Sequence, residues 1–261
     1  MKDKTFSWLG GIVSAWEMLL DIPIPGIIRK YADRKNTSVI SVAAGFVILG
    51  AAAGLLLAAA GGILNVSWIN RFAAALLFSL AATAFCEYKD SGRGFRLLVS
   101  AIRRKLAGNS FSEAILEAAP DDGSFEHSSG NLGSICILLF ELIAFALLAY
   151  YRVCLWSVAV FAGAFTIQML FATLYNGNGA FLPIPQNRIK QIWIAPLAVT
   201  MVLFLIFPAA TIAAAAIVGC LGQIIHRDLA ASQTPISADV ITLSGKITEL
   251  FLLLCGLIFV L

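Results

Sequence analysis

Charged residues are scarce in this chain of 261 residues, because Lys, Arg, Asp and Glu together make up only 13% of it. A soluble domain has about a quarter charged residues. This chain is instead 60% hydrophobic, with a mean hydropathy of +0.90. A water-exposed surface could not accommodate so much apolar area. The composition therefore excludes a soluble globular domain and predicts a protein solvated by lipid.

The residue types that build common catalytic and metal sites are also rare. The two histidines, His127 and His226, are far apart in sequence, and no Cys/His spacing indicates zinc. The five cysteines lie in or beside apolar runs, which favours packing thiols over disulfides. No Ser/His/Asp arrangement, phosphate-binding loop or dinucleotide fingerprint is present. Glu17, Asp21 and two prolines interrupt the N-terminal apolar stretch, so we expect no cleavable signal peptide.

Long apolar runs fill most of the remaining sequence, and no internal repeat supports transporter-like symmetry. Each run has the roughly 17–25 residues that a helix needs to cross a bilayer. We therefore predict an all-α, polytopic membrane bundle of about seven transmembrane helices, with residues 1–261 as a single domain. The predicted spans are 38–64, 67–86, 132–151, 154–175, 191–208, 209–225 and 243–261. Pro208 joins the fifth and sixth in a tight hairpin or one broken unit, and Gly50 and Gly54 mark a close helix–helix contact.

The basic residues predict the orientation in the membrane. Fifteen lysines and arginines fall in the N-terminal segment and in loops 87–131, 176–190 and 226–242, whereas the opposite side has only Arg71 and Arg152. The positive-inside rule places the rich side in the cytoplasm. The sequence thus predicts an inner-membrane protein with a cytoplasmic N-terminus and a periplasmic or external C-terminus. Topology accounts for the basic residues, so nucleic acid is not an expected partner.

Two amphipathic segments are expected at the cytoplasmic membrane surface. Residues 6–20 are rich in aromatic and aliphatic side chains and are followed by Pro23 and Pro25. In loop 87–131, residues 95–106 combine an apolar stripe with four cations, and a capping box opens a short helix over 110–119. Both segments are typical of interfacial helices that anchor to lipid, the expected partner. The apolar stripe of the second consists of Phe95, Leu98, Val99, Ile102 and Leu106.

Polar clusters at the ends of the spans are the candidate chemical sites. Residues 87–90 could hold Mg²⁺ or form a solvated helix end. Residues 121–134 could present backbone N–H groups to phosphate or merely cap a helix. Residues 175–179 have the composition of a turn. Within the spans, Glu141 and Glu249 are expected to face the bundle interior, with an ion pair between Glu249 and Lys246 as the simpler alternative.

Several of these segments resemble the cobalamin synthase family, adenosylcobinamide-GDP ribazoletransferases. Residues 15–25, Ala-Trp-Glu-Met-Leu-Leu-Asp-Ile-Pro-Ile-Pro, resemble the opening of the family, where an amphipathic run ends in a Leu-Pro-Val-Pro type element. Residues 132–134, Leu-Gly-Ser, resemble the end of its Lys-Asp-Ser-Arg-Ile-Gly-Thr segment. Residues 221–229, followed by Thr234, Asp239 and residues 248–250, resemble its closing Gly-Gly-x-Thr-Gly-Asp and Glu-Leu-Thr-Glu-Leu elements. The order and spacing match over nearly the whole chain.

The sequence departs from the family at the motif for its metal ion. The family's His-Leu-Asp-Gly-Leu-Ala-Asp-Thr-x-Asp-Gly is replaced by Cys-Glu-Tyr-Lys-Asp-Ser-Gly-Arg-Gly at residues 86–94. Glu87 and Asp90 remain as candidate ligands, while Lys89 and Arg93 are additional cations. The Asp and Arg that flank the serine in the next motif are Ser128 and Gly130 here, and the later Gly-Gly is Ala230-Ala231.

The resemblance implies a transferase that joins α-ribazole to adenosylcobinamide-GDP with Mg²⁺. Its implied catalytic residues are Asp90 and Asp239, and its implied metal ligands are Glu87 and Asp90. Substrate-binding positions would be Ser129, Gly133, Ser134, Thr234 and Glu249. The alternative is a non-catalytic paralogue that binds a corrinoid, a lipid or a protein partner. Self-association into a homo-oligomer is left open.

Overall fold

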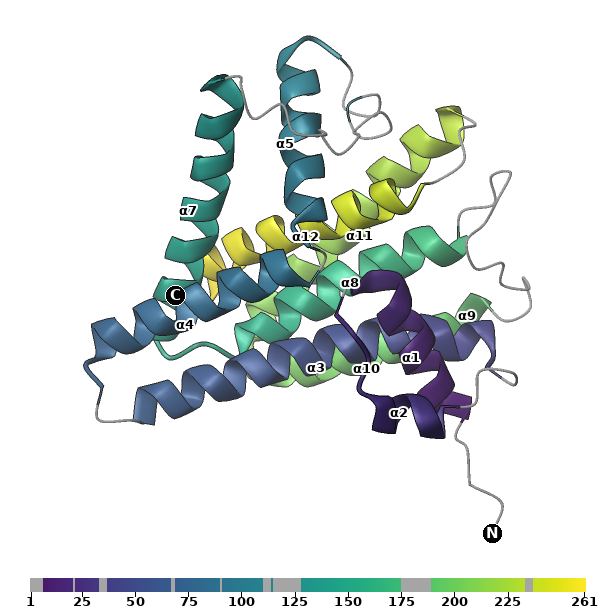
Figure 1. Cartoon of the computed structure of the whole chain (residues 1–261), viewed down its shortest axis with the longest axis horizontal. Helices are drawn as coiled ribbons and strands as arrows, with labels where there is room; N and C mark the ends of the chain where they lie inside the picture. The colour runs from purple at the N-terminus through teal and green to yellow at the C-terminus, as the bar shows by residue number, and fades with distance from the viewer. Residues whose placement is uncertain are drawn as a thin grey trace.

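The computed structural model describes residues 7–20, 22–32, 37–66, 69–89, 91–109, 114, 128–174, 189–232 and 237–261. These residues fold into a helical bundle in which no β-strand occurs (Figure 1). The helices are α1 (Ser7–Leu19), α2 (Gly26–Tyr31), α3 (Val39–Val66), α4 (Arg71–Tyr88), α5 (Arg93–Leu106), α7 (Ser128–Tyr150), α8 (Trp156–Leu174), α9 (Ile189–Ile192), α10 (Ile194–Ile206), α11 (Pro208–Ser232) and α12 (Ala238–Phe259).

Helix α8 lies at the centre of the bundle, between α3 and α12. Glycines of α3 allow the close approach, because a Cβ atom on Gly50 would lie 2.6 Å from the carbonyl oxygen of Phe161. A Cβ atom on Gly54 would lie 2.6 Å from the carbonyl oxygen of Ser157. The predicted small-residue contact is therefore confirmed, and its partner is α8.

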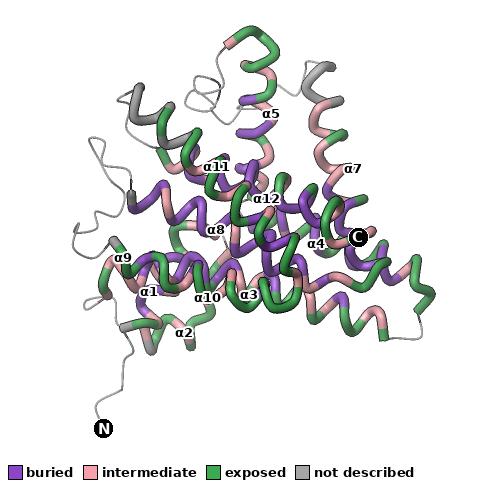
Figure 2. The backbone as a smooth tube through the Cα atoms, turned by 180° about the vertical axis from the view of Figure 1, so that it is seen from behind, coloured by how far each residue is buried: buried purple, intermediate pink, exposed green. Residues whose placement is uncertain are grey.

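The buried residues follow α8 and α12, as the purple tube in Figure 2 shows. Trp156 at the start of α8 is fully buried, and its indole Nε1 donates a hydrogen bond to the carbonyl oxygen of Leu252, at 2.9 Å. The outward faces of α3, α4 and α10 expose large apolar side chains instead. This arrangement suits a bundle with a packed interior and lipid around it.

Among the described residues, five helices are long and apolar enough to cross a membrane, by length and composition. They are Val39–Val66, Arg71–Tyr88, Gly133–Tyr150, Trp156–Thr173 and Ala238–Phe259. The fifth and sixth predicted spans form shorter apolar helices, over Lys190–Ile206 and Pro208–Ile224. Phe207 alone separates α10 from α11, and the two helices pack together, as expected for the hairpin at Pro208. The structure thus supports an all-α membrane bundle, and the count of seven spans stays a prediction.

The two amphipathic helices are more deeply packed than a simple lipid anchor. Helix α1 ends before the proline pair, as predicted, and buries Val13 and Ala15 while packing against α3. Helix α5 buries Leu97 and Ala101 as well as Leu98, and it packs against α12.

Of the predicted apolar stripe of α5, Leu98 is buried in the bundle, whereas Ile102 and Leu106 are exposed on the protein surface. Only the first turns of α5 enter the bundle, and the rest projects from it (Figure 1). The predicted short helix over 110–119 lies almost entirely outside the described residues.

Candidate functional site: a buried ion network

A tight turn between α4 and α5 brings several charged residues to one corner of the bundle. Ser91 and Gly92 have left-handed backbone conformations, with φ of 54° and 68°. Glycine adopts this conformation without steric cost and commonly follows a helix end. The N–H of Gly92 donates to the carbonyl oxygen of Glu87, at 2.6 Å. Helix α5 therefore starts at Arg93 beside the last turn of α4.

Lys246 of α12 lies among three carboxylates that come from three helices. Its Nζ is 2.5 Å from Oε1 of Glu141 in α7 and 2.7 Å from Oε1 of Glu87 in α4. It is also 3.3 Å from Oε1 of Glu249, one turn later in α12. Lys89 at the end of α4 pairs with the other oxygen of Glu249. Together these five residues form the ion network.

The ion network is almost fully shielded from solvent. The side chains of Glu141 and Glu249 are 0% exposed and that of Lys246 is 2% exposed, while Glu87 at 23% marks the open edge. The Nζ of Lys89 also lies 5.1 Å from the ring centre of Phe161, within cation–π distance. Burying unpaired charges in this environment would be very costly, so the lysines and carboxylates stabilise one another.

The formal charges of the ion network do not cancel. Three carboxylates and two ammonium groups sum to −1. Glu141 meets Lys246 through Oε1, and its buried Oε2 has no hydrogen-bond partner among the described residues. Glu141 is therefore the least satisfied member of the network.

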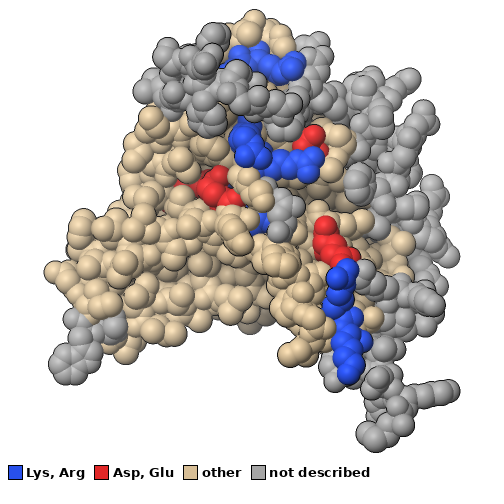
Figure 3. All heavy atoms as spheres, in the orientation of Figure 1, with Lys and Arg blue, Asp and Glu red and all other residues tan. Residues whose placement is uncertain are grey.

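A second ion pair lies nearer the surface. Nε of Arg93 donates to Oδ1 of Asp239 at 2.7 Å, and the two side chains are 41% and 24% exposed. This pair joins the start of α5 to the first turn of α12, where Ser237 caps the helix. On the face in Figure 3, charged side chains gather around α5 and the end of α4, whereas the described surface of α3 carries none.

The structure brings together some of the residues predicted for the site. Glu87 and Glu249 share Lys246, but Asp239 is ten residues before Glu249 in the same helix and pairs separately with Arg93. Ser129 lies in the first turn of α7, where its side chain is not described, and Gly133 and Ser134 follow in the next turn. Asp90, Thr234, His127 and residues 175–179 lie outside the described residues.

Sequence reasoning identified the carboxylates more fully than the lysines. Glu141 was expected to face the interior, and the pair of Lys246 with Glu249 was the simpler alternative; both features are present in the structure. The contacts of Lys246 with Glu87 and of Lys89 with Glu249 were missed. These residues are about 160 positions apart, and nothing in the local sequence indicates that they meet.

The described residues do not fit the Mg²⁺ ion that the resemblance implies. Potential ligand atoms of Cys86, Glu141 and Glu249 lie within 4.8 Å of one another. However, the ammonium group of Lys246 already contacts both carboxylates, and a buried thiol is a poor ligand for a hard cation. Glu87, a predicted ligand, is likewise paired with Lys246.

Comparison of the chain with models of known protein families, with curated proteins and with solved structures finds no match.

Proposed function

We propose that this chain is a non-catalytic membrane protein, organised like a cobalamin synthase, that binds a corrinoid, a lipid or a protein partner. One observation carries this proposal. The ammonium group of Lys246 contacts three carboxylates at 2.5–3.3 Å, in the region where the family resemblance implies a metal ion.

Charge supplies the physical argument. The resemblance aligns the family's Glu-Leu-Thr-Glu-Leu with residues 246–250, so Lys246 stands where the first glutamate is expected. A divalent cation about 4 Å from an ammonium group is repelled by about 8 kcal/mol at an effective dielectric of 20. Among the described residues, Glu141 and Glu249 could offset this repulsion, but both are already paired with lysines. Binding of Mg²⁺ and a pyrophosphate substrate is therefore disfavoured.

The transferase reaction is the second candidate, and the convergence of charged residues favours it. Glu87 and Arg93 lie within residues 86–94, which stand in place of the family's metal motif, and Asp239 lies in α12, which carries part of the resemblance. Lysines can hold phosphate directly, so a transfer of α-ribazole to adenosylcobinamide-GDP without metal would use Lys89 and Lys246. Both lysines would first have to leave their carboxylates.

A transfer assay distinguishes the two candidates. The full-length chain in lipid nanodiscs would receive adenosylcobinamide-GDP and α-ribazole, with Mg²⁺ or with chelator, and GMP release would be measured. We expect no turnover, in a protein that is monodisperse and helical. Turnover that chelator abolishes would refute the proposal. Turnover that is unaffected by chelator would establish the second candidate if Lys89→Ala abolishes it and the exposed control Lys105→Ala does not.

The basic residues also support a proposed orientation in the membrane. The N-terminus and loop 87–131 lie in the cytoplasm, and the C-terminus lies on the outer side. A reporter fused after Leu261 should be active only on the outer side, and one inserted near Asp122 only in the cytoplasm. If both reporters give the same compartment, the number of spans is not seven.

A further inference from the structure

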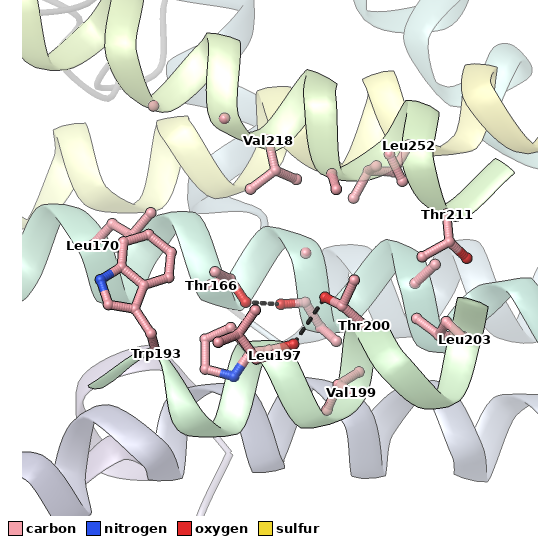
Figure 4. A pocket seen from close by; sticks show the side chains of 18 of the residues that line it. Thr166, Leu170, Trp193, Leu197, Val199, Thr200, Leu203, Thr211, Val218 and Leu252 are labelled. Carbon is pink, nitrogen blue, oxygen red and sulfur yellow. Dashed lines mark hydrogen bonds between the residues drawn. The ribbon is translucent and has the colours of Figure 1, made fainter. Parts of the chain in front are cut away.

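An apolar cavity of about 450 Å³ lies between α8, α10, α11 and α12, and its lining includes none of the five ion-network residues. Figure 4 shows the side chains that surround it, with Trp193 and Leu170 at one end and Leu203 and Thr211 at the other. Its volume is in the range of small-molecule sites, which are about 300–1,000 Å³. Its walls are apolar, with the aromatic rings of Phe171 and Trp193 among aliphatic side chains, apart from a few hydroxyl and amide groups.

Small residues on α11 keep this cavity open. A Cβ atom added to Gly219 would meet no atom within 4 Å, and one on Gly222 would only touch Ile167 Cδ1, at 3.5 Å. Because both glycines line the cavity, a longer side chain at either position has room to extend into it without a clash with the backbone. The volume of the cavity therefore depends on glycine at positions 219 and 222.

Two of the three threonines in the cavity wall add little polarity. Thr166 donates its hydroxyl proton to the carbonyl oxygen of Ala162 at 2.7 Å, and Thr200 donates to Pro196 at 2.8 Å, as the dashed lines in Figure 4 show. Because these two donors are satisfied within their own helices, the middle of the cavity suits a hydrocarbon chain. Thr211 at the far end differs, because its buried Oγ1 has no hydrogen-bond partner among the described residues.

One end of the cavity has the character of a membrane–water boundary. Trp193 is 38% exposed, and indole rings are enriched at this level of a bilayer. Lys190 is exposed one turn before Trp193, and Arg227 is exposed one turn beyond Gln223, which also lines the cavity. Two cations thus lie close to the same end, which is complementary to an anionic headgroup.

We propose that this cavity binds one acyl chain of an anionic glycerophospholipid from the surrounding bilayer, with the headgroup phosphate near Lys190 and Arg227. Helix α10 has 13 residues and is about 20 Å long, shorter than the roughly 30 Å hydrocarbon core. The exposed apolar side chains of α10 and α11 face the lipid expected around the bundle, so an acyl chain is the apolar molecule at hand for this cavity. This inference does not depend on whether the chain has transferase activity.

The test compares matched glycine variants of the full-length protein. Gly219→Leu fills the cavity, whereas Gly62→Leu adds the same side chain on α3, where a Cβ atom also meets nothing within 4 Å. Each protein is purified from nanodiscs that contain equal phosphatidylglycerol and phosphatidylcholine, and retained lipid is measured by native mass spectrometry. We expect wild type and Gly62→Leu to retain phosphatidylglycerol and Gly219→Leu to retain about tenfold less.

A second pair of variants tests the headgroup. Lys190→Ala with Arg227→Ala should lower the preference for phosphatidylglycerol over phosphatidylcholine by about tenfold. Unchanged melting temperatures would show that all variants are folded. Equal retention of lipid by Gly219→Leu and wild type would overturn the proposal. So would equal binding of both lipids by wild type, or loss of a dimer rather than of lipid in Gly219→Leu.

Discussion

Replacing Lys246 by methionine should destabilise the bundle more than the same replacement of any other described lysine. Methionine has a similar length and no charge, so the change removes the ammonium group that contacts Glu87, Glu141 and Glu249, and within the ion network only Glu249 keeps an ammonium partner, Lys89. The formal charge of the network falls from −1 to −2.

The contacts of Lys246 set the expected magnitude. At 2.5, 2.7 and 3.3 Å, each contributes about 5–7 kcal/mol of Coulomb attraction at an effective dielectric of 20. Desolvation of the ammonium group and repulsion among the carboxylates offset most of this sum. Removing one partner of a buried ion pair therefore costs about 3–5 kcal/mol. For a protein of this size, that corresponds to a drop of about 6–20 °C in melting temperature.

The assay is thermal unfolding in detergent, followed by intrinsic fluorescence. Lys105→Met, which removes an exposed lysine at the end of α5, is the control and should change the melting temperature by less than about 2 °C. Adding Glu141→Gln to Lys246→Met should recover part of the loss, because it removes the least satisfied carboxylate. If Lys246→Met and Lys105→Met behave alike, the ion network does not stabilise the bundle and the electrostatic argument is wrong.

Two further predictions concern helix packing and capping. Gly54→Val should lower the free energy of unfolding by about 1–3 kcal/mol through overpacking, because its Cβ atom would lie 2.5 Å from Cα of Val158. Gly62→Val on the same helix is the control and should lower it much less. Equal melting temperatures for the two variants would contradict the α3–α8 contact. Ser237→Ala should cost about 1 kcal/mol and speed amide exchange in the first turn of α12, because Ser237 Oγ accepts a hydrogen bond from the N–H of Val240 at 3.3 Å. Ser237→Asp keeps an acceptor and should exchange as wild type does; faster exchange there as well would mean that the cap is not the cause.

The apolar runs predicted the helices well because the bilayer imposes their length. Each predicted span contains a helix, and the boundaries of α3 and α8 agree with 38–64 and 154–175 within two residues. The last helix begins at Ala238, five residues earlier than predicted. The charges of Lys246 and Glu249 suggested that the span begins close to them. In the structure both residues lie near the middle of α12, and their side chains are buried in the bundle.

The packing of α5 and the ion network could not be predicted in the same way. Periodicity identifies which residues of α5 share a face, but not which neighbouring helix covers that face. The buried Leu97 and Ala101 depend on how α12 lies beside α5. Likewise, the distance of Lys246 from Glu87 and Glu141 is set by how α4, α7 and α12 pack. A single sequence gives the charges in each helix but not their partners in other helices.

The ion network also gives α7 one preferred rotation about its axis. Apolar helix faces are nearly interchangeable in lipid, so packing alone selects weakly among rotations. A shift of α7 by one residue would turn Glu141 by about 100° and carry its carboxylate away from Lys246. An unpaired carboxylate in the bilayer is expensive, so this shift is disfavoured. Because Lys246 contacts carboxylates of both α4 and α7, the same argument fixes these helices relative to α12. Lysines can therefore hold the helices of a membrane bundle together around a buried site that does not suit a metal ion.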